Sequence, residues 1–313
     1  MLAKINLLLA AGFYFGITQV FGAELGSAAA GLAVLATIAW LWISEALHVS
    51  VTALLVPLLA GLSGVMAFNQ ALVSFADPVI FLFIGGFALA AGLQRQGLDR
   101  WMANQVLRRA GSDFRRAVLW LFWLTALLSM WIGNTATAAM MLPLALGLLG
   151  SLSAERDRAT YTYVLLGIAF SANIGGIGTL VGSPPNAIAA SNVGISFAGW
   201  LLWGIPLVLV LMPLMEIALR RALKPQLNFA VLPAQGVVSW GAGQTRMIVL
   251  FCGVVLLWVF GAPFGAALGF KAGYDAAVAV LALVLLHGLR LASWRDIEKG
   301  TDWGVLLLFG GGL

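Results

Sequence analysis

The sequence predicts an all-α polytopic membrane protein, and two observations carry this prediction. Of the 313 residues, 62% are hydrophobic and only 9% are charged, whereas a soluble domain carries about 25% charged residues. Apolar runs that approach the roughly 20 residues needed for a membrane-spanning helix recur along the chain, for example at 7–22, 28–43 and 246–262. In such a chain the net charge of +5 reports membrane topology, so we expect no nucleic-acid partner.

The apolar runs, taken in order, define the spans. We expect spans near 5–22, 28–45, 49–66 and 78–93, a paired segment at 117–151, a long interrupted segment at 161–193, further spans near 197–219, 246–262 and 272–289, and a final run from Trp303. With the N-terminus inside, all of the 17 Lys and Arg residues except Lys271 fall on one side. The positive-inside rule makes that side cytoplasmic. We therefore expect a multi-pass protein of the plasma (inner) membrane, in contact with the lipid bilayer, with a cytoplasmic N-terminus and amphipathic connectors at 94–116 and 289–300.

The paired segment 118–151 has an uncharged polar centre, Gly133-Asn134-Thr135-Ala136-Thr137. Each arm has about 16 residues and reaches about 24 Å, which is less than the hydrocarbon thickness. The sequence therefore predicts a re-entrant helical hairpin whose tip lies within the membrane, where irregular backbone must be buried in protein or line a cavity. The alternative is a pair of short tilted spans joined by a polar turn at the outer interface.

The interrupted segment runs from Tyr161 to Val193, longer than one crossing needs. Pro184 and Pro185 cannot donate helical hydrogen bonds, and Ser183 is disfavoured in helix because it precedes a proline. Four glycines admit backbone conformations that other residues resist: Gly175, Gly176, Gly178 and Gly182. We expect two half-helices joined by an unwound linker, which offers carbonyl groups to a cation and a helix N-terminus to an anion. The break is predicted to be a binding site.

A short internal repeat suggests how the chain is organised. Residues 82–87 (LFIGGF) recur as 308–313 (LFGGGL), with Asp77 and Asp302 upstream. The predicted topology gives the copies opposite orientations, as in inverted-repeat secondary transporters. The final run has too few residues to cross the membrane, so we expect a truncated second repeat. We assign 1–116 to scaffold helices and a connector, 117–224 to the transport region of the first repeat, and 225–313 to the start of the second repeat.

Five segments together resemble one known family, the divalent anion/sodium symporters, which carry dicarboxylates, citrate or sulfate. The resemblance covers essentially the whole chain, and its third and fourth segments are its most specific motifs. The segments are ISEALHVSVTALLVPLL (43–59), DPVIFLFIGGFALAAGL (77–93), SMWIGNTATAAMMLP (129–143), SANIGGIGTLVGSPPN (171–186) and DWGVLLLFGGGL (302–313).

The resemblance implies a set of site residues. It implies that Asn134, Thr135 and Ser183 bind the substrate carboxylate, and that Ser129, Gly133, Asn134 and Gly182 bind sodium. Gly133 departs from the family's Ser-Asn-Thr triplet, so a hydroxyl is lost although the backbone groups remain.

The resemblance also implies a homodimeric secondary active transporter that moves di- or tricarboxylate, or sulfate-like, anions by an elevator-type mechanism. Sodium is the expected coupling ion, and no other cofactor or metal is expected. A sodium-independent exchanger of the same fold and an anion channel are the alternatives. An enzyme is not expected, because the sequence contains neither an HExxH motif nor clustered aspartates that could hold magnesium. Because elevator-type sites are shared between repeats, we expect no transport by residues 1–313 alone.

Overall fold

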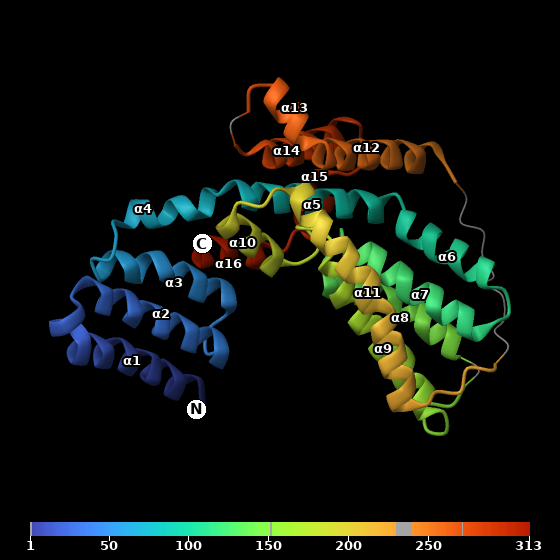
Figure 1. The fold of residues 1–313 in the computed structure, drawn as a ribbon, viewed down its shortest axis with the longest axis horizontal. Coiled ribbons are helices and arrows are strands. Elements are labelled where there is room, and N and C mark those ends of the chain that lie inside the picture. The colour runs from blue at the N-terminus through green and yellow to red at the C-terminus, as the bar shows by residue number, and fades with distance from the viewer. Residues whose placement is uncertain (1, 151, 230–239, 271) are drawn as a thin grey trace. The chain divides into compact units, whose positions relative to one another are not determined.

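The computed structural model describes residues 2–150, 152–229, 240–270 and 272–313, and in these ranges every regular element is helical (Figure 1). Five helical stretches are long and apolar enough to cross a membrane: Leu2–Leu25, Ser27–Ser44, Phe68–Arg95, Phe197–Leu223 and Ala242–Val259. The predicted all-α polytopic fold is confirmed. Lys271, the one basic residue predicted on the opposite side of the membrane, lies outside the described residues.

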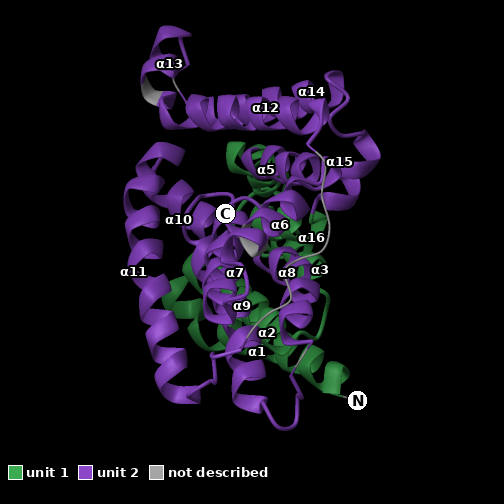
Figure 2. Ribbon diagram, turned by 90° about the vertical axis from the view of Figure 1, so that its right-hand side faces the viewer, with its two compact units in different colours: residues 1–81, 302–313 green, residues 82–301 purple. Residues whose placement is uncertain are grey.

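The chain forms two compact units (Figure 2), Met1–Phe81 with Asp302–Leu313, and Leu82–Thr301. The predicted domains divide the chain by role and not by packing, so their boundaries stay predictions.

The first unit contains three long helices, a short helical connector and the last helix of the chain. They are α1 (Leu2–Leu25), α2 (Ser27–Ser44), α3 (Val49–Leu62), α4 (Phe68–Val73), the 3₁₀ turn η1 (Ser74–Ala76) and α16 (Trp303–Gly312). α1 and α2 form a hairpin, and α3 packs against α2, α4 and α16. The hydroxyl of Thr37 donates to the Ala10 carbonyl oxygen at 3.3 Å, and the hydroxyls of Tyr14 and Ser63 lie 2.7 Å apart. These bonds satisfy polar groups between apolar helices, as a membrane environment requires.

The second unit is built around α7 (Phe114–Ser129), which is buried along most of its length. The helix packs against α6 (Leu98–Ala110), α8 (Asn134–Leu149) and α9 (Arg158–Gly176). Its remaining helices are α10 (Pro184–Val193), α11 (Phe197–Leu223), α12 (Ala242–Val259), α13 (Gly261–Ala267), α14 (Tyr274–Gly288) and α15 (Trp294–Gly300), and α5 (Pro78–Arg95) contains the boundary between the units. One stripe of α7 stays exposed, at Arg116, Trp120, Trp123 and Leu127, and the rest of the helix belongs to the core of this unit.

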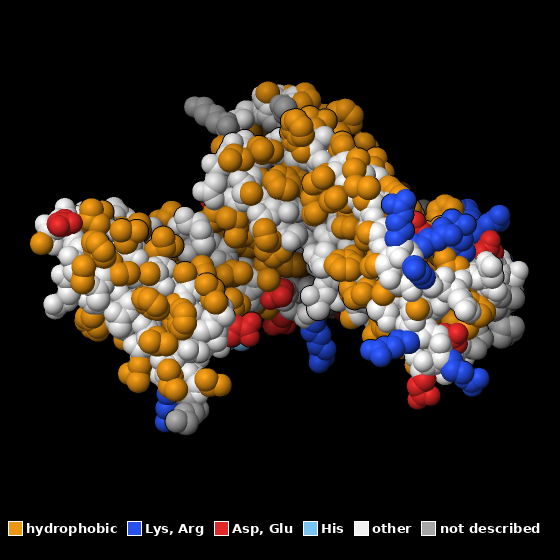
Figure 3. Space-filling view, turned by 60° about the horizontal axis from the view of Figure 1, so that its bottom comes forward, with side chains coloured by type: hydrophobic (Ala, Val, Ile, Leu, Met, Phe, Trp, Pro, Cys, Tyr) orange, Lys and Arg blue, Asp and Glu red, His pale blue; other side chains and the backbone are white. Residues whose placement is uncertain are grey.

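The outer surface is largely apolar. Leu202 and Trp203, on α11, are more than 70% exposed, and Leu209, Val210 and Leu214 on the same helix are more than half exposed. Figure 3 shows hydrophobic side chains spread over much of the visible face, while Lys and Arg gather in a few places. Large apolar patches of this extent are rare on soluble monomers, and they are expected where helices face lipid.

Two turns far apart in the sequence have the same backbone geometry. Gly64, after α3, has φ 69°, and Arg290, after α14, has φ 56°. The residue after each donates its N–H to the carbonyl oxygen five residues back, at 3.0 Å for Val65 and 2.9 Å for Leu291. The interval from Gly64 to Arg290 equals the interval between the two copies of the LFxGG sequence. The two turns are therefore spaced as the two sequence copies are, although the same bond also follows Gly194 and Gly269.

The glycines of the two copies also make equivalent contacts. A Cβ added at Gly85, in α5, would lie 2.5 Å from the Cβ of Ala279, in α14. A Cβ added at Gly311, in α16, would lie 3.0 Å from the Cβ of Ala53, in α3. The interval from Gly85 to Gly311 again equals the interval from Ala53 to Ala279. In each unit a glycine of one copy thus packs on an alanine of the other, and the contact requires the absence of a side chain.

Candidate functional site

The first break separates α7, which ends at Ser129, from α8, which begins at Asn134. Each helix has 16 residues, as the sequence predicts for the hairpin arms. Between them Trp131 packs into an aromatic cluster, with its ring centroid 4.8 Å from that of Phe251 and 6.5 Å from that of Trp258. The tip is therefore held by packing on α12 even though its backbone is irregular. Its depth in the membrane stays a prediction.

The second break separates α9, which ends at Gly176, from α10, which begins at Pro184. Pro184 and Pro185 occupy the first two positions of α10, where a missing N–H costs nothing because those groups have no helical partner. Ser183 is in extended backbone, with φ −152° and ψ 136°, as expected for a residue before proline. The predicted pair of half-helices with an unwound linker is present in the structure.

The glycines of the linker serve close packing, which corrects the expectation that they supply unusual backbone angles. None of the four has positive φ. A Cβ at Gly175 would clash with the backbone of Ala126 in α7, and one at Gly176 would clash with the side chain of Asn134. A Cβ at Gly182 would lie 2.5 Å from the Gly176 carbonyl oxygen and 2.9 Å from that of Ser129. These contacts bring the two breaks together.

Polar groups from both breaks meet at the side chain of Asn134. Ser129, which is fully buried, donates its hydroxyl hydrogen toward the Ala172 carbonyl oxygen at 2.7 Å and toward Asn134 Oδ1 at 2.8 Å. The Nδ2 of Asn134 donates to Oδ1 of Asn173 at 3.2 Å. The other amide atom of Asn134 also lies 3.1 Å from the Ala172 carbonyl oxygen and 3.2 Å from the Gly182 carbonyl oxygen.

The orientation of the Asn134 amide determines what this site can hold. With Oδ1 inward, four oxygen atoms face one another, from Ser129, Asn134, Ala172 and Gly182. Carbonyl and hydroxyl oxygens at broken helices are typical sodium ligands, and these oxygens, which lie 2.7–3.2 Å apart at hydrogen-bond distance, would have to move apart to hold a cation among them. With the amide rotated, Nδ2 would instead donate to those three neighbours without an ion. The donor set therefore fits sodium, and it offers one specific alternative.

Four helix ends surround this cluster. α7 and α9 end here, so they contribute carbonyl groups and the negative ends of their dipoles, which favour a cation. α8 and α10 begin here, so they contribute positive dipole ends, which favour an anion. Only α8 also offers free N–H groups in its first turn, because α10 starts with Pro184 and Pro185 and the Asn186 N–H donates to the Ser183 carbonyl oxygen. In the described residues no group of three or more His, Cys, Asp or Glu could hold a metal. The groups of the cluster carry no charge, since they come from Ser129, Asn134, Ala172 and Gly182, and the helix ends around it suit an anion together with a cation.

The structure brings together three of the residues predicted for the site, Ser129, Asn134 and Gly182. Thr135, which is exposed, lies outside this oxygen cluster, in the first turn of α8. Ser183 is half-buried and makes no side-chain capping bond to α10, so its hydroxyl is not used to start that helix. Gly133 precedes α8, and a Cβ added there would meet no atom within 4 Å.

Two residues that the sequence argument left out hold the linker in place. Asn186 donates from Nδ2 to the carbonyl oxygens of Gly176 at 2.7 Å and Thr179 at 2.8 Å. Thr179 donates its hydroxyl to the Met130 carbonyl oxygen and accepts from the Gly182 N–H at 3.2 Å. An amide directly after two prolines, in the first turn of a half-helix, was the available signal for Asn186.

Helices that break at one shared polar site, in a chain with several helices long and apolar enough to cross a membrane, are typical of helical membrane transporters. The chain belongs to the citrate transporter family, whose model matches residues 39–313. It is 50% identical over 290 residues to an uncharacterized transporter of Haemophilus influenzae, covering 90% of this chain and 63% of that protein. It is 35% identical over 295 residues to an uncharacterized transporter of Methanocaldococcus jannaschii, covering 94% of this chain and 66% of that protein.

A further relative, the sodium-dependent high-affinity dicarboxylate transporter 3 of Caenorhabditis elegans, is 31% identical over 333 residues, covering 88% of this chain and 58% of that protein. The chain spans about two thirds or less of the length of these relatives. The predicted resemblance to divalent anion/sodium symporters is confirmed. The family and these relatives are transporters and not enzymes, as predicted.

Proposed function

We propose that the protein is a secondary active transporter that moves di- or tricarboxylate anions across the membrane in company with sodium. The observation that carries this proposal is the oxygen cluster around Asn134, which lies between two helix C-termini and two helix N-termini. A cation held by Ser129, Asn134, Ala172 and Gly182 would place positive charge beside the starts of α8 and α10, where a carboxylate binds favourably. Asn134, Thr135 and Ser183 are the side chains that we assign to the substrate.

The proposal includes an inverted repeat and an elevator mechanism. The matched turns at Gly64 and Arg290, together with the matched Gly–Ala contacts, support two copies of one unit. The predicted topology gives these copies opposite orientations, which is the arrangement of inverted-repeat transporters. In this proposal the hairpin, the broken helix and α11 move as one body against scaffold helices in a homodimer. The protein lies in the plasma membrane with its N-terminus in the cytoplasm.

Sodium coupling is tested by replacing Asn134. If a cation lies among the oxygens, Asn134→Asp keeps a ligand oxygen and adds charge, so sodium binding is retained or strengthened. If the amide is rotated and donates hydrogen bonds, Asn134→Asp places a carboxylate against carbonyl oxygens and sodium has no role. Isothermal titration calorimetry measures sodium binding to the natural protein and to Asn134→Asp, and it distinguishes these outcomes. Asn134→Ala, which removes the ligand oxygen, is the control for both. Sodium-independent succinate exchange by the natural protein would favour the exchanger of the same fold.

The depth of the hairpin tip is tested separately, with a cysteine in place of Ala136, which is exposed in the first turn of α8 and is not one of the assigned ligands. Cys252 is exposed, so the background variant is Cys252→Ser. A re-entrant tip predicts slow reaction with impermeant thiol reagents and protection by sodium or succinate. Fast labelling from outside that neither ligand slows would support the two short spans with an outer turn.

An anion channel is the remaining alternative. A transporter predicts uptake of labelled succinate that saturates with concentration and depends on the sodium gradient. Uptake that rises linearly and follows only the membrane potential would support the channel.

A further inference from the structure

A cavity of about 460 Å³ lies in the second unit, where α5 and α14 end and α15 begins. Arg95, His287, Arg290, Ser293 and Asp296 are among the residues that line it. The breaks around Asn134 contribute nothing to its lining, so it is separate from the site described above. The predicted topology places these helix ends at the cytoplasmic surface.

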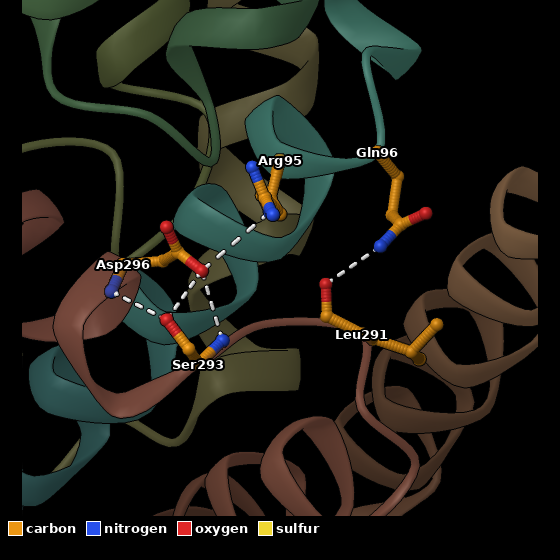
Figure 4. A network of polar contacts seen from close by, with 5 residues as sticks. All are labelled: Arg95, Gln96, Leu291, Ser293 and Asp296. Carbon is orange, nitrogen blue, oxygen red and sulfur yellow. Dashed lines mark hydrogen bonds and ion pairs between the residues drawn. The ribbon is translucent and has the colours of Figure 1, made fainter.

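The walls of the cavity are fixed by a polar network (Figure 4). Gln96 donates from Nε2 to the Leu291 carbonyl oxygen at 2.7 Å, which ties the end of α5 to the turn after α14. Arg95 Nε lies 3.7 Å from Asp296 Oδ2. Ser293 donates to the same carboxylate from its hydroxyl at 2.6 Å and from its N–H at 2.9 Å. The carboxylate of Asp296 therefore neutralises the charge of Arg95, and the charge of Arg290 remains without a carboxylate partner among the residues that line the cavity.

Comparison with the matching turn after α3 shows that the fold does not require Arg290. There the equivalent position is Gly64, which adopts the same left-handed conformation without strain. Arg290 adopts it at φ 56°, a region that residues with a Cβ rarely occupy. The position equivalent to Asp296 is Gln70, so the copies share a backbone and differ in charge. Glu45 and Lys224, at the ends of α2 and α11, adopt the same conformation, so what distinguishes Arg290 is its place in the wall of the cavity.

The positive-inside rule alone explains a basic residue somewhere in this turn, but it does not explain Arg290 at its strained position. Arg295, five residues further along the chain, is exposed on the neighbouring helix α15. It supplies basic charge without a strained backbone. The cavity wall includes Arg290 and excludes Arg295. The two arginines therefore form a matched pair for an experiment.

We propose that this cavity binds the phosphate group of an anionic phospholipid. The guanidinium group presents a planar set of donors that matches phosphate geometry, and two arginines with one histidine line the cavity. Leu289 and Trp294, which flank the turn, are 45% and 51% exposed. Exposed apolar and indole groups beside a basic pocket are typical of the membrane interface, and this favours a lipid over a soluble phosphate.

The test compares binding of short-chain phosphatidylglycerol to the purified protein and to single variants in neutral detergent. We expect Arg290→Gln to weaken binding at least about tenfold, the effect of losing one charge-assisted hydrogen bond, while Arg295→Gln changes it less than about twofold. Arg290→Gly should lose binding equally and keep or raise the melting temperature, because glycine relieves the strain. Short-chain phosphatidylcholine and inorganic phosphate should not compete.

Three outcomes would overturn the proposal. Equal weakening by the Arg290 and Arg295 variants would mean that diffuse charge alone attracts the lipid. A lower melting temperature for Arg290→Gly with unchanged lipid binding would make Arg290 a structural residue. If inorganic phosphate displaces phosphatidylglycerol when its concentration is lower than that of the lipid, the cavity would be a site for a soluble anion.

Discussion

At Gly133, between α7 and α8, an added Cβ would meet no atom within 4 Å. At Gly182, between α9 and α10, the same Cβ would lie within 3 Å of two carbonyl oxygens. The first break thus has open space beside its glycine. The second break has backbone atoms of Gly176 and Ser129 packed against its glycine. The difference indicates that the linker between α9 and α10 sets the positions of the oxygens, and that the hairpin tip contributes side chains to that frame.

This division predicts that substitutions at the end of α9 and in the linker after it have larger effects than substitutions at the tip. The largest effect is expected for Gly176→Ala, because the new methyl group would displace the Asn134 side chain. Losing the bonds of Asn134 to Ser129 and Asn173 costs about 1–3 kcal/mol for each group left unpaired. We expect sodium-driven succinate uptake in proteoliposomes, measured on a protein that contains both repeats, to fall more than about tenfold.

The matched control for this experiment is Gly147→Ala. Gly147 lies inside α8, and a Cβ there would meet no atom within 4 Å, so alanine should leave uptake unchanged and stabilise the helix slightly. Uptake with unchanged sodium dependence in Gly176→Ala would show that the position of Asn134 does not matter, and the comparison between the breaks would lose its basis.

A smaller effect is expected for Thr179→Val, which cuts the direct link between the breaks. The Thr179 side chain is fully buried, and its hydroxyl joins the Met130 carbonyl oxygen to the Gly182 N–H. Valine keeps the shape and leaves both partners unsatisfied, which costs about 1–3 kcal/mol of unfolding free energy. We expect a lower melting temperature and a sodium dissociation constant raised by up to about tenfold.

Thr179→Ser restores the hydroxyl and should restore both quantities. If Thr179→Val lowers the melting temperature and leaves the sodium constant unchanged, then the bond supports only the fold, and the linker does not set the geometry at the tip.

The sequence predicts the helices and both breaks well, because composition and proline chemistry are local properties of the chain. It also predicts Ser129, Asn134 and Gly182 as one group, through the resemblance to a family. It does not predict that Gly175 faces Ala126 or that Asn186 holds the Gly176 carbonyl oxygen. Those contacts depend on which helices meet, and a glycine needed for close approach looks the same in sequence as a glycine needed for positive φ.

The repeat shows the same limit. Only the LFxGG segment can be recognised as a repeat in the amino-acid sequence. The turns at Gly64 and Arg290 have the same backbone conformation but different side chains. Both helices end at these positions in the left-handed conformation, whereas the side chains differ. A pattern search therefore finds the six residues whose packing is constrained and misses the turn whose geometry is constrained.

The smallest effect, and the one that sharpens the comparison most, is expected for Gly133→Ser. With φ −51° and open space at its Cβ, position 133 accepts serine without strain. The hydroxyl can act as an added sodium ligand beside Asn134, or it can cap the N–H groups at the start of α8, since Gly133 is the N-cap residue. A cap in place of glycine is worth only a few tenths of a kcal/mol, which would raise the melting temperature slightly without sodium. A hydroxyl that binds sodium would instead lower the sodium dissociation constant a few-fold, equivalent to less than about 1.4 kcal/mol, and leave the sodium-free melting temperature unchanged.

Gly133→Ala supplies the same Cβ without the hydroxyl, so titration of sodium into both variants isolates the effect of the serine oxygen. A serine variant that binds sodium no better than the alanine variant would show that position 133 faces away from the ion, and that the packed linker and Asn134 form the sodium site without it.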